Sequence, residues 1–428
     1  MNATGKIRSV PSGDLFYPYL HRIPAITEIC DERETEGIVI TRFRFNSKEG
    51  CFDSARTRRS EVYAVMAQPA SVTGHKRPGI LVFHGGNGKA EEAAAIGWAR
   101  QGFVALTPEL PGWIAENEIK GTSRFQGKEY GMNRFAVTPG VRSCAVFDSI
   151  SAGLGAFNLL EQMPDVDASR LGVTGISWGG YLTTLLCGYL DRRVKAAFSL
   201  YGCGCYDAGT VFAEALNRLP EDEKRVWLKH YDAGNHSDRI TASFLFYAAA
   251  NDSFFYPPSI AATLNRMQEA RKYVCFAPNC DHQFDLPGGT GLQTSGDSVF
   301  TESEPAFFRH MLEKESGTLP EIIRIEGDAK AREHEVIFSF LPEGARCWAY
   351  YCADTAEHWK SKEWNPMEVV RQSNRSCLFR LPELAQAYDW FAGTTFPLAT
   401  AGSVSPMNIG TTVQHAEIRD VEINCPGV

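Results

Sequence analysis

Short apolar runs alternate with segments of helical periodicity between residues 38 and 313. Continuous apolar runs bounded by turn residues are typical of strands buried on both faces of a sheet. Such runs cover residues 78–83, 103–107, 171–176, 194–200, 243–250 and 272–276. Helices are predicted over residues 90–101, 144–162, 181–186, 257–270 and 303–313. Strands that alternate with helices imply right-handed crossovers, so we expect a doubly wound, mostly parallel sheet.

The segments before the first buried run show a different pattern. Residues 38–45 and 61–67 alternate apolar and polar positions, and we expect them to pair as an antiparallel edge of the sheet. Residues 1–36 are polar and form a predicted N-terminal extension, with residues 17–20 as its anchor on the main body. In open α/β sheets ligands bind beyond the carboxyl ends of the strands. Candidate chemistry is therefore sought at those ends.

The pattern changes again after residue 315. Residues 315–320 have the composition of a linker, and no long helical period follows them. Short strand-like segments separated by turn residues cover 322–325, 335–340, 345–352, 376–381, 388–392 and 411–418. This pattern predicts a small all-β sandwich of the fibronectin III or immunoglobulin type over residues 320–428. We therefore predict two domains, 1–315 and 320–428, with Trp348 and Tyr388 as packing residues of the second.

Composition narrows the range of partners. The chain has 428 residues and a formal net charge of −8 without basic clusters, which argues against a nucleic-acid partner. No apolar run approaches the roughly 18 residues of a membrane-spanning helix. The first eight residues lack the apolar core of a secretory signal. We expect a cytoplasmic protein, with a secreted protein trimmed of its signal as the alternative. The sequence gives no oligomeric state.

The twelve cysteines show no metal-binding spacing. Several of them, such as Cys144, Cys187 and Cys377, lie within apolar runs, where a thiol acts as a small hydrophobic group. We expect mostly free thiols, no bound metal and no cofactor.

The motif Gly175-x-Ser177-x-Gly179 lies between a predicted strand and a predicted helix. This is the setting of a nucleophile elbow, in which a serine stands on a turn too tight for large neighbours. The glycines at 175 and 179 then have a steric reason to be glycine. We interpret Ser177 as a candidate nucleophile, while a chance match in a glycine-rich turn is the alternative.

A serine nucleophile needs a base and a carboxylate that orients the base. Asp252 directly follows the predicted strand 243–250, and His282 follows the predicted strand 272–276. Both stand in the order expected for this architecture, which is serine, acid, histidine. Asp281 is a poor candidate for the acid, because adjacent side chains point apart.

The oxyanion of such a reaction is bound by two backbone N–H groups. In this architecture one comes from the residue after the nucleophile, here Trp178. The second comes from the loop after the strand 78–83, where His84 precedes Gly85 and Gly86. We choose Gly86 as the second donor, with Asn87 as the alternative.

These residues resemble the α/β-hydrolase superfamily, in its acetylxylan esterase, dienelactone hydrolase and prolyl-oligopeptidase-like branch. The likeness is carried by His84-Gly85-Gly86, Gly175-Ile176-Ser177-Trp178-Gly179-Gly180-Tyr181, Asn251-Asp252 and His282. It implies Ser177 as nucleophile, Asp252 as acid and His282 as base. The relatives labelled acetylxylan esterase-like also end in a small β-sandwich. The resemblance implies an ester hydrolase that removes acetyl or other short acyl groups from a carbohydrate or a small molecule.

Evidence on the substrate is thinner. Glu109 and Trp113 follow the predicted strand 103–107 and are expected to face the substrate, and residues 114–139 are interpreted as a lid. A prolyl-oligopeptidase-like peptidase is the alternative enzyme, although 37 leading residues are too few for a β-propeller. A dienelactone-type hydrolase with a cysteine nucleophile is disfavoured by Ser177.

The alternative of another class is a non-catalytic, carbohydrate-binding protein. Its sugar-stacking platforms would be the tryptophans of the second domain, namely Trp348, Trp359, Trp364 and Trp390. The competing interpretation is that these side chains fill a core or a seam between domains.

Overall fold

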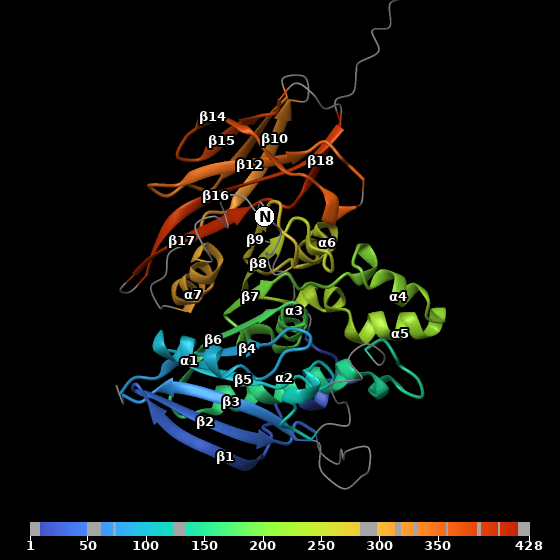
Figure 1. Ribbon diagram of the computed structural model, residues 1–428, viewed down its shortest axis with the longest axis vertical. Coiled ribbons are helices and arrows are strands. Elements are labelled where there is room, and N and C mark those ends of the chain that lie inside the picture. Colours follow the sequence, from blue (N-terminus) through green and yellow to red (C-terminus); the bar gives the residue numbers. More distant parts are fainter. Residues whose placement is uncertain are drawn as a thin grey trace, which may run out of the picture. The chain divides into compact units, whose positions relative to one another are not determined.

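The computed structural model describes most of the chain (Figure 1). The described residues are 9–48, 61–71, 74–122, 134–282, 298–312, 318–328, 332–356, 358–382, 387–400 and 403–417. Their contacts group into two units: residues 1–247, 254–272 and 307–316 form the first, and 248–253, 273–306 and 317–428 form the second. This grouping differs from the expected boundary at 315–320, because two segments around the last strands of the α/β region belong to the second unit.

The first unit is built around one mixed sheet. Its strands are β1 (Ile26–Thr35), β2 (Ile38–Phe45), β3 (Val62–Pro69), β4 (Arg77–Phe83), β5 (Val104–Pro108), β6 (Val166–Ile176), β7 (Ala196–Leu200) and β8 (Ser243–Ala249), the last as far as Tyr247. They lie in the order β1-β2-β3-β5-β4-β6-β7-β8. The strands from β5 to β8 pair in parallel, while β1, β2, β3 and β5 pair antiparallel. The antiparallel edge is as expected.

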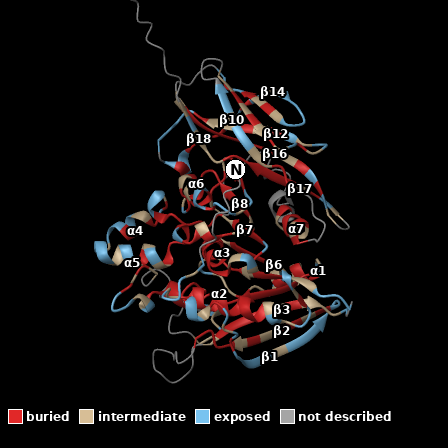
Figure 2. Ribbon diagram, turned by 180° about the vertical axis from the view of Figure 1, so that it is seen from behind, coloured by how far each residue is buried: buried red, intermediate tan, exposed pale blue. Residues whose placement is uncertain are grey.

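Helices connect the parallel strands, as the periodicity predicts. They are α1 (Glu92–Arg100), α2 (Ala145–Gln162), α3 (Trp178–Leu190), α4 (Ala213–Asn217), α5 (Glu221–Tyr231) and α6 (Pro257–Arg266), while α7 (Ser298–Leu312) runs through both units. Every residue of α3 is buried, which Figure 2 shows as a red helix. The helix that follows Ser177 is therefore part of the core.

The N-terminal extension contains a strand that the sequence pattern does not predict. Strand β1 pairs with β2 along its length, yet it is exposed at nearly every position and pale blue in Figure 2. An edge strand rich in charged side chains shows no alternation of apolar and polar residues, so periodicity misses it. Its pairing is supported by ion pairs such as Asp31 with Arg42, 2.7 Å apart.

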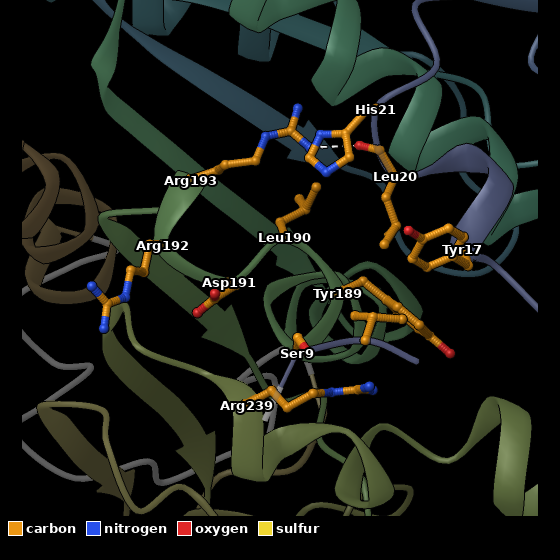
Figure 3. Close-up of a pocket in the computed structure, with 12 residues that line it drawn as sticks. Ser9, Tyr17, Leu20, His21, Tyr189, Leu190, Asp191, Arg192, Arg193 and Arg239 are labelled. Atoms are coloured by element: carbon orange, nitrogen blue, oxygen red, sulfur yellow. Dashed lines mark hydrogen bonds between the residues drawn. The ribbon is translucent and has the colours of Figure 1, made fainter. Parts of the chain in front are cut away.

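The expected anchor at residues 17–20 is confirmed at Leu20, whereas Tyr17 is 46% exposed. Leu20 and its neighbour Phe16 are buried. The guanidinium of Arg193 donates to the carbonyl of Leu20 at 2.6 Å, the dashed line in Figure 3, and is paired with Glu161. A cavity of about 410 Å³ lies beside this contact and is lined by the last residues of α3, including Tyr189. The extension thus docks at the end of α3 remote from Ser177.

The second unit holds two antiparallel arrays of strands. One has the order β9 (Lys272–Ala277), β17 (Ser403–Gly410), β16 (Ala387–Thr400), β12 (Arg346–Cys352) and β13 (Asn365–Pro366), with β18 (Gln414–Glu417) beside β16. The other has the order β10 (Ile322–Asp328), β11 (Glu333–Phe338), β15 (Ser376–Arg380) and β14 (Glu368–Gln372). A shared apolar cluster includes Phe338, Phe379 and Trp390. A β-rich region is confirmed, and its fibronectin or immunoglobulin type stays a prediction.

Three strands of this unit, namely β14, β17 and the two-residue β13, were not expected. The predicted strand 411–418 corresponds to β18 alone. Strand β17 ends at Gly410, before this predicted range begins. Strand β17 contains Pro406. A proline disfavours the prediction of a strand, since its backbone nitrogen cannot donate a hydrogen bond to a neighbouring strand. Strand β14 is mostly exposed and lacks an apolar alternation. Tyr388 is fully buried as expected, whereas Trp348 is only partly buried.

Candidate active site

Ser177 stands at the junction of β6 and α3 with a strained backbone. Its φ is 56° and its ψ is −117°, a conformation that non-glycine residues rarely adopt. The N–H of Ser177 donates to the carbonyl of Leu200 at the end of β7 at 2.8 Å. Strand β6 also pairs with β4, where Phe83 lies opposite Gly175. Three parallel strands thus end around the serine, as a nucleophile elbow requires.

The glycines around Ser177 are required by close backbone contacts. A Cβ atom on Gly175 would lie 2.4 Å from the carbonyl oxygen of Gly179, and one on Gly179 would lie 2.4 Å from that of Phe83. Both are far below the contact distance of real Cβ atoms, as the motif predicted. Gly202, after β7, is a third such position, because its Cβ would lie 2.2 Å from the carbonyl oxygen of Ser177.

The loop after β4 is held by the ring of His84. The Nδ1–H of His84 donates to the carbonyl of Gly85 at 2.6 Å, and its Nε2 accepts from the N–H of Leu110 at 3.0 Å. Burial lowers the pKa of His84 to about 4, so the ring is neutral at neutral pH, which suits an acceptor at Nε2. His84 therefore ties the loop to the segment after β5.

This loop runs next to the nucleophile. A Cβ atom on Gly85 would lie 3.4 Å from the Cβ of Ser177. Gly86 follows in a turn, and Asn87 adopts a φ of 60°. Trp178 is the first residue of α3, where N–H groups have no partner within the helix. Trp178 thus directly follows Ser177, and Gly86 directly follows the residue that approaches this serine, while the role of both as oxyanion donors stays a prediction.

Asp252 and His282 are brought together. The Nδ1 of His282 lies 2.9 Å from the Oδ2 of Asp252, whose side chain is fully buried. The side chain of His282 is 10% exposed. A buried carboxylate on Nδ1 fixes the tautomer in which Nδ1 carries the proton, and so directs Nε2 away from Asp252.

Asp281 has a different function from Asp252. Its Oδ1 accepts from the N–H of His282 at 2.7 Å and from the N–H of Ser253 at 2.8 Å. Burial alone would raise the pKa of Asp281, but these bonds and the ammonium of Lys360 outweigh it and hold the pKa below its usual value. Asp281 is thus a charged clamp on the two loops that carry the acid and the base. The sequence excluded it as the acid but gave no sign of this clamp.

The two predicted substrate-binding side chains point into the protein. Glu109 is 2% exposed, and its two oxygens accept from the N–H groups of Lys120 and Gly121, each at 2.8 Å. Burial raises its pKa to about 7. Trp113 is fully buried, with its ring centroid 4.9 Å from that of Trp178. These contacts indicate structural roles for both side chains, and their contact with a substrate stays a prediction.

Much of the predicted lid lies outside the described residues, which omit 123–133. In the part that is described, residues 114–122 return to Glu109 through the two bonds above. Residue 114 also forms a bridge with Gly88 of the loop after β4. The start of this segment is therefore fixed against the loop that contains Gly86.

Aromatic rings pack around Trp178 in the first turn of α3. The ring centroids of Trp113 and Phe212 each lie 4.9 Å from that of Trp178. The guanidinium of Arg134 lies 5.4 Å from the Trp178 ring and 5.2 Å from the Phe212 ring, within the range of a cation–π contact. This cluster fills the space beside the elbow with bulky side chains.

The part of the chain that the structure describes contains no group of three or more His, Cys, Asp or Glu side chains able to hold a metal ion. The cysteines in it form no disulfide. No helix in it is both long and apolar enough to cross a membrane. Trp364 and Trp390 are buried, so these two tryptophans fill the core instead of presenting a sugar platform.

A model described as "Dienelactone hydrolase family" matches residues 62–291, which is more than half of the 428 residues. The chain belongs to the dienelactone hydrolase family. The match includes the elbow, Asp252 and His282, and the family resemblance seen in the sequence is confirmed. In this member of the dienelactone hydrolase family the residue at the elbow is serine.

Several solved structures are similar to this chain. Acetyl xylan esterase 1 from a Thermoanaerobacterium species is 19% identical, with a TM-score of 0.50 over 71% of this chain and 95% of that one. An acetyl xylan esterase from a Paenibacillus species is 19% identical, with a TM-score of 0.48 over 65% and 91%. The Pyrococcus horikoshii acylaminoacyl peptidase is 15% identical, with a TM-score of 0.45 over 69% and 52%. No curated protein matches the sequence. The family match indicates a hydrolase, and the structure with a TM-score of 0.50 supports the α/β-hydrolase fold.

Proposed function

We propose that the protein is a serine carboxylester hydrolase with Ser177 as nucleophile, His282 as base and Asp252 as the acid that orients the base. The observation that carries this proposal is the 2.9 Å contact between Nδ1 of His282 and buried Asp252. It prepares the opposite ring nitrogen, Nε2, to accept a proton. Ser177, on its strained turn, supplies the hydroxyl in the architecture where these residues form a triad.

The proposed reaction has two steps. Nε2 of His282 takes the proton of Ser177 Oγ while the oxygen attacks the ester carbonyl, and the N–H groups of Gly86 and Trp178 bind the oxyanion. Collapse releases the alcohol, which receives that proton from His282, and leaves an acyl-serine. Water, deprotonated by His282, then cleaves the acyl-serine, and the acid product leaves with Ser177 protonated again. Asp252 stabilises the imidazolium in both steps.

We further propose that the acyl group is short, such as acetyl, and that the alcohol is a carbohydrate or a small molecule. The rings of Trp113 and Phe212 around Trp178 support this proposal, because they occupy the space beside the elbow. A long acyl chain would have to displace this packed cluster, which dispersion and burial stabilise.

The experiment compares p-nitrophenyl acetate, butyrate and octanoate, and a peptide p-nitroanilide, as substrates of the wild type and of Ser177→Ala. We expect the acetate ester to be preferred, and Ser177→Ala to lose at least about 10⁴-fold in kcat. Ser169→Ala, at an exposed serine that bonds only to Asp167, is the matched control and should keep full activity. Retention of most activity in Ser177→Ala would overturn the triad, and a preference for the anilide would overturn the ester assignment.

A further inference from the structure

The acid and base loops of the second unit are both fastened to one short segment, residues 359–364. Asn251, next to Asp252, is 1% exposed. Its Nδ2 donates to the carbonyls of Trp359, Lys360 and Lys362 at 3.1, 3.3 and 2.6 Å. The buried side-chain amide of Asn251 thus binds three carbonyl groups of the segment and holds the segment next to the loop that carries Asp252.

The loop that leads to His282 is fastened to the same segment. The Nδ2 of Asn279 donates to the carbonyl of Trp364 at 2.8 Å, and the N–H of Trp364 donates back to the Oδ1 of Asn279 at 2.8 Å. Asn279 adopts a φ of 53°, a conformation that asparagine tolerates better than most residues. These two reciprocal bonds resemble those between paired residues of an antiparallel sheet, and they lie at the start of the loop that carries His282.

Asp281 joins the two loops to each other and to the segment. Its Oδ1 accepts from Ser253 and His282, as described above, while its Oδ2 lies 3.1 Å from the ammonium of Lys360. The residues on either side of Asp252, and those just before His282, are therefore each held by a bond. The bonds do not reach the catalytic side chains themselves.

Residues 359–364 are in turn anchored in the β-rich part of the second unit. The ammonium of Lys362 is 2.8 Å from the Oδ2 of Asp389 on β16, and both side chains are buried. The ring of Trp364 packs edge-on against Phe391 of the same strand, with centroids 4.9 Å apart. A buried ion pair and an aromatic contact make the segment a rigid support.

We propose that residues 359–364 are a positioning element of the active site, which holds Asp252 and His282 in register through Asn251, Asn279 and Asp281. This inference rests on the proposed function and gives the C-terminal region a role in catalysis. Misplacing a reacting group by about 1 Å can cost about 10²-fold in rate, so fastening the loops on both sides of the acid–base pair has a direct kinetic effect.

The test uses full-length variants and p-nitrophenyl acetate, with rates expressed per active site that a fluorophosphonate can titrate. Asn279→Gly removes both bonds to Trp364, and glycine suits the positive φ without strain. Asp281→Ala removes the clamp, while Asp281→Asn keeps a carbonyl oxygen that can accept from Ser253 and His282. Asn365→Ala is the matched control, because the exposed side chain of Asn365 is next to the segment and donates to the carbonyl of Glu363, and the backbone pairing of β13 with β12 does not depend on it.

We expect Asn279→Gly and Asp281→Ala each to lower kcat about 10-fold or more with KM changed less than about 2-fold, within the range that misplacement produces. Asp281→Asn should recover most of the loss, and Asn365→Ala should match the wild type. A merely structural role would not confine the loss to kcat, and it would not be rescued by Asp281→Asn.

Unchanged kcat per titrated site in Asn279→Gly and Asp281→Ala would overturn the proposal. If Asn279→Gly does not fold, the comparison of Asp281→Ala with Asp281→Asn decides, and equal rates in these two also overturn it. Failure of the proposed function is seen separately, as a wild type that does not hydrolyse the ester or a Ser177→Ala variant that still does. A wild type that depends on Ser177 while all positioning variants keep its rate refutes the positioning element alone.

Discussion

The nucleophile of the first unit is held by backbone geometry, whereas the acid–base pair of the second unit is held by side-chain hydrogen bonds. Ser177 is fixed by the ends of parallel strands and by glycines that admit no Cβ atom. Around Asp252 and His282, amide and carboxylate side chains make the contacts that fix the loops. The first arrangement tolerates almost no added atoms, and the second tolerates substitutions that keep donors and acceptors.

The largest expected effect comes from a substitution of Asp252 in the second unit. In Asp252→Asn, an amide replaces the carboxylate that accepts from Nδ1 of His282, and the opposite tautomer of the ring is favoured. We expect kcat to fall about 10⁴-fold, the loss that this exchange causes in serine protease triads. Steady-state kinetics with p-nitrophenyl acetate measure this loss, and Glu214→Gln, at an exposed glutamate, is the control. A loss below about 10-fold would show that Asp252 does not orient the base.

The backbone geometry that holds Ser177 is tested by Gly202→Ala. The new Cβ would lie 2.2 Å from both the carbonyl oxygen of Ser177 and the N–H nitrogen of Tyr181, and neither backbone atom can move without distorting α3. We expect the free energy of unfolding to fall by about 3 kcal/mol, as for a severe overpacking defect. Denaturant unfolding measures it.

Gly97→Ala is the matched control for this change. A Cβ on Gly97 meets nothing within 4 Å, and Gly97 lies inside α1. Alanine there should raise the free energy of unfolding by about 0.5–1 kcal/mol. Equal effects of the two substitutions would refute the steric account of the elbow.

A further expected effect is a pH dependence of stability at Glu109. Because burial raises its folded pKa to about 7 from an ordinary 4.5, the native state holds this proton more tightly than the unfolded chain does. The contribution of Glu109 to stability is therefore full below about pH 4.5 and is lost as the pH rises through about 7. The free energy of unfolding of the wild type, relative to Glu109→Gln, should fall between pH 5 and pH 8. A difference that is constant or rises with pH contradicts this account.

The sequence predicts the backbone-held half better than the side-chain-held half, for a physical reason. The elbow needs glycines at fixed spacing, and buried parallel strands need continuous apolar runs, so both are visible as local patterns. Asp252 and His282 were proposed because each lies in the loop that follows a strand. The roles of Asn279 and Asp281 depend on partners about 80 residues away along the chain, and no local pattern records such contacts.

The limits of prediction follow the same division. Strand β1 was missed because an exposed edge strand lacks alternation, and β17 was missed because it contains Pro406. Glu109 and Trp113 follow a strand, as Asp252 does, yet their side chains turn inward and hold loops together. Position after a strand identifies residues near the site, while the direction of a side chain is decided by packing.

The central claim is that His282, oriented by Asp252, activates Ser177. The most direct measurement is labelling of the wild type with a fluorophosphonate, followed by mass spectrometry of the peptides, in parallel with His282→Ala. The account predicts one phosphonylated residue, Ser177, and labelling slower by at least about 10³-fold in the variant. Labelling at another serine, or equal rates in the two proteins, would contradict it.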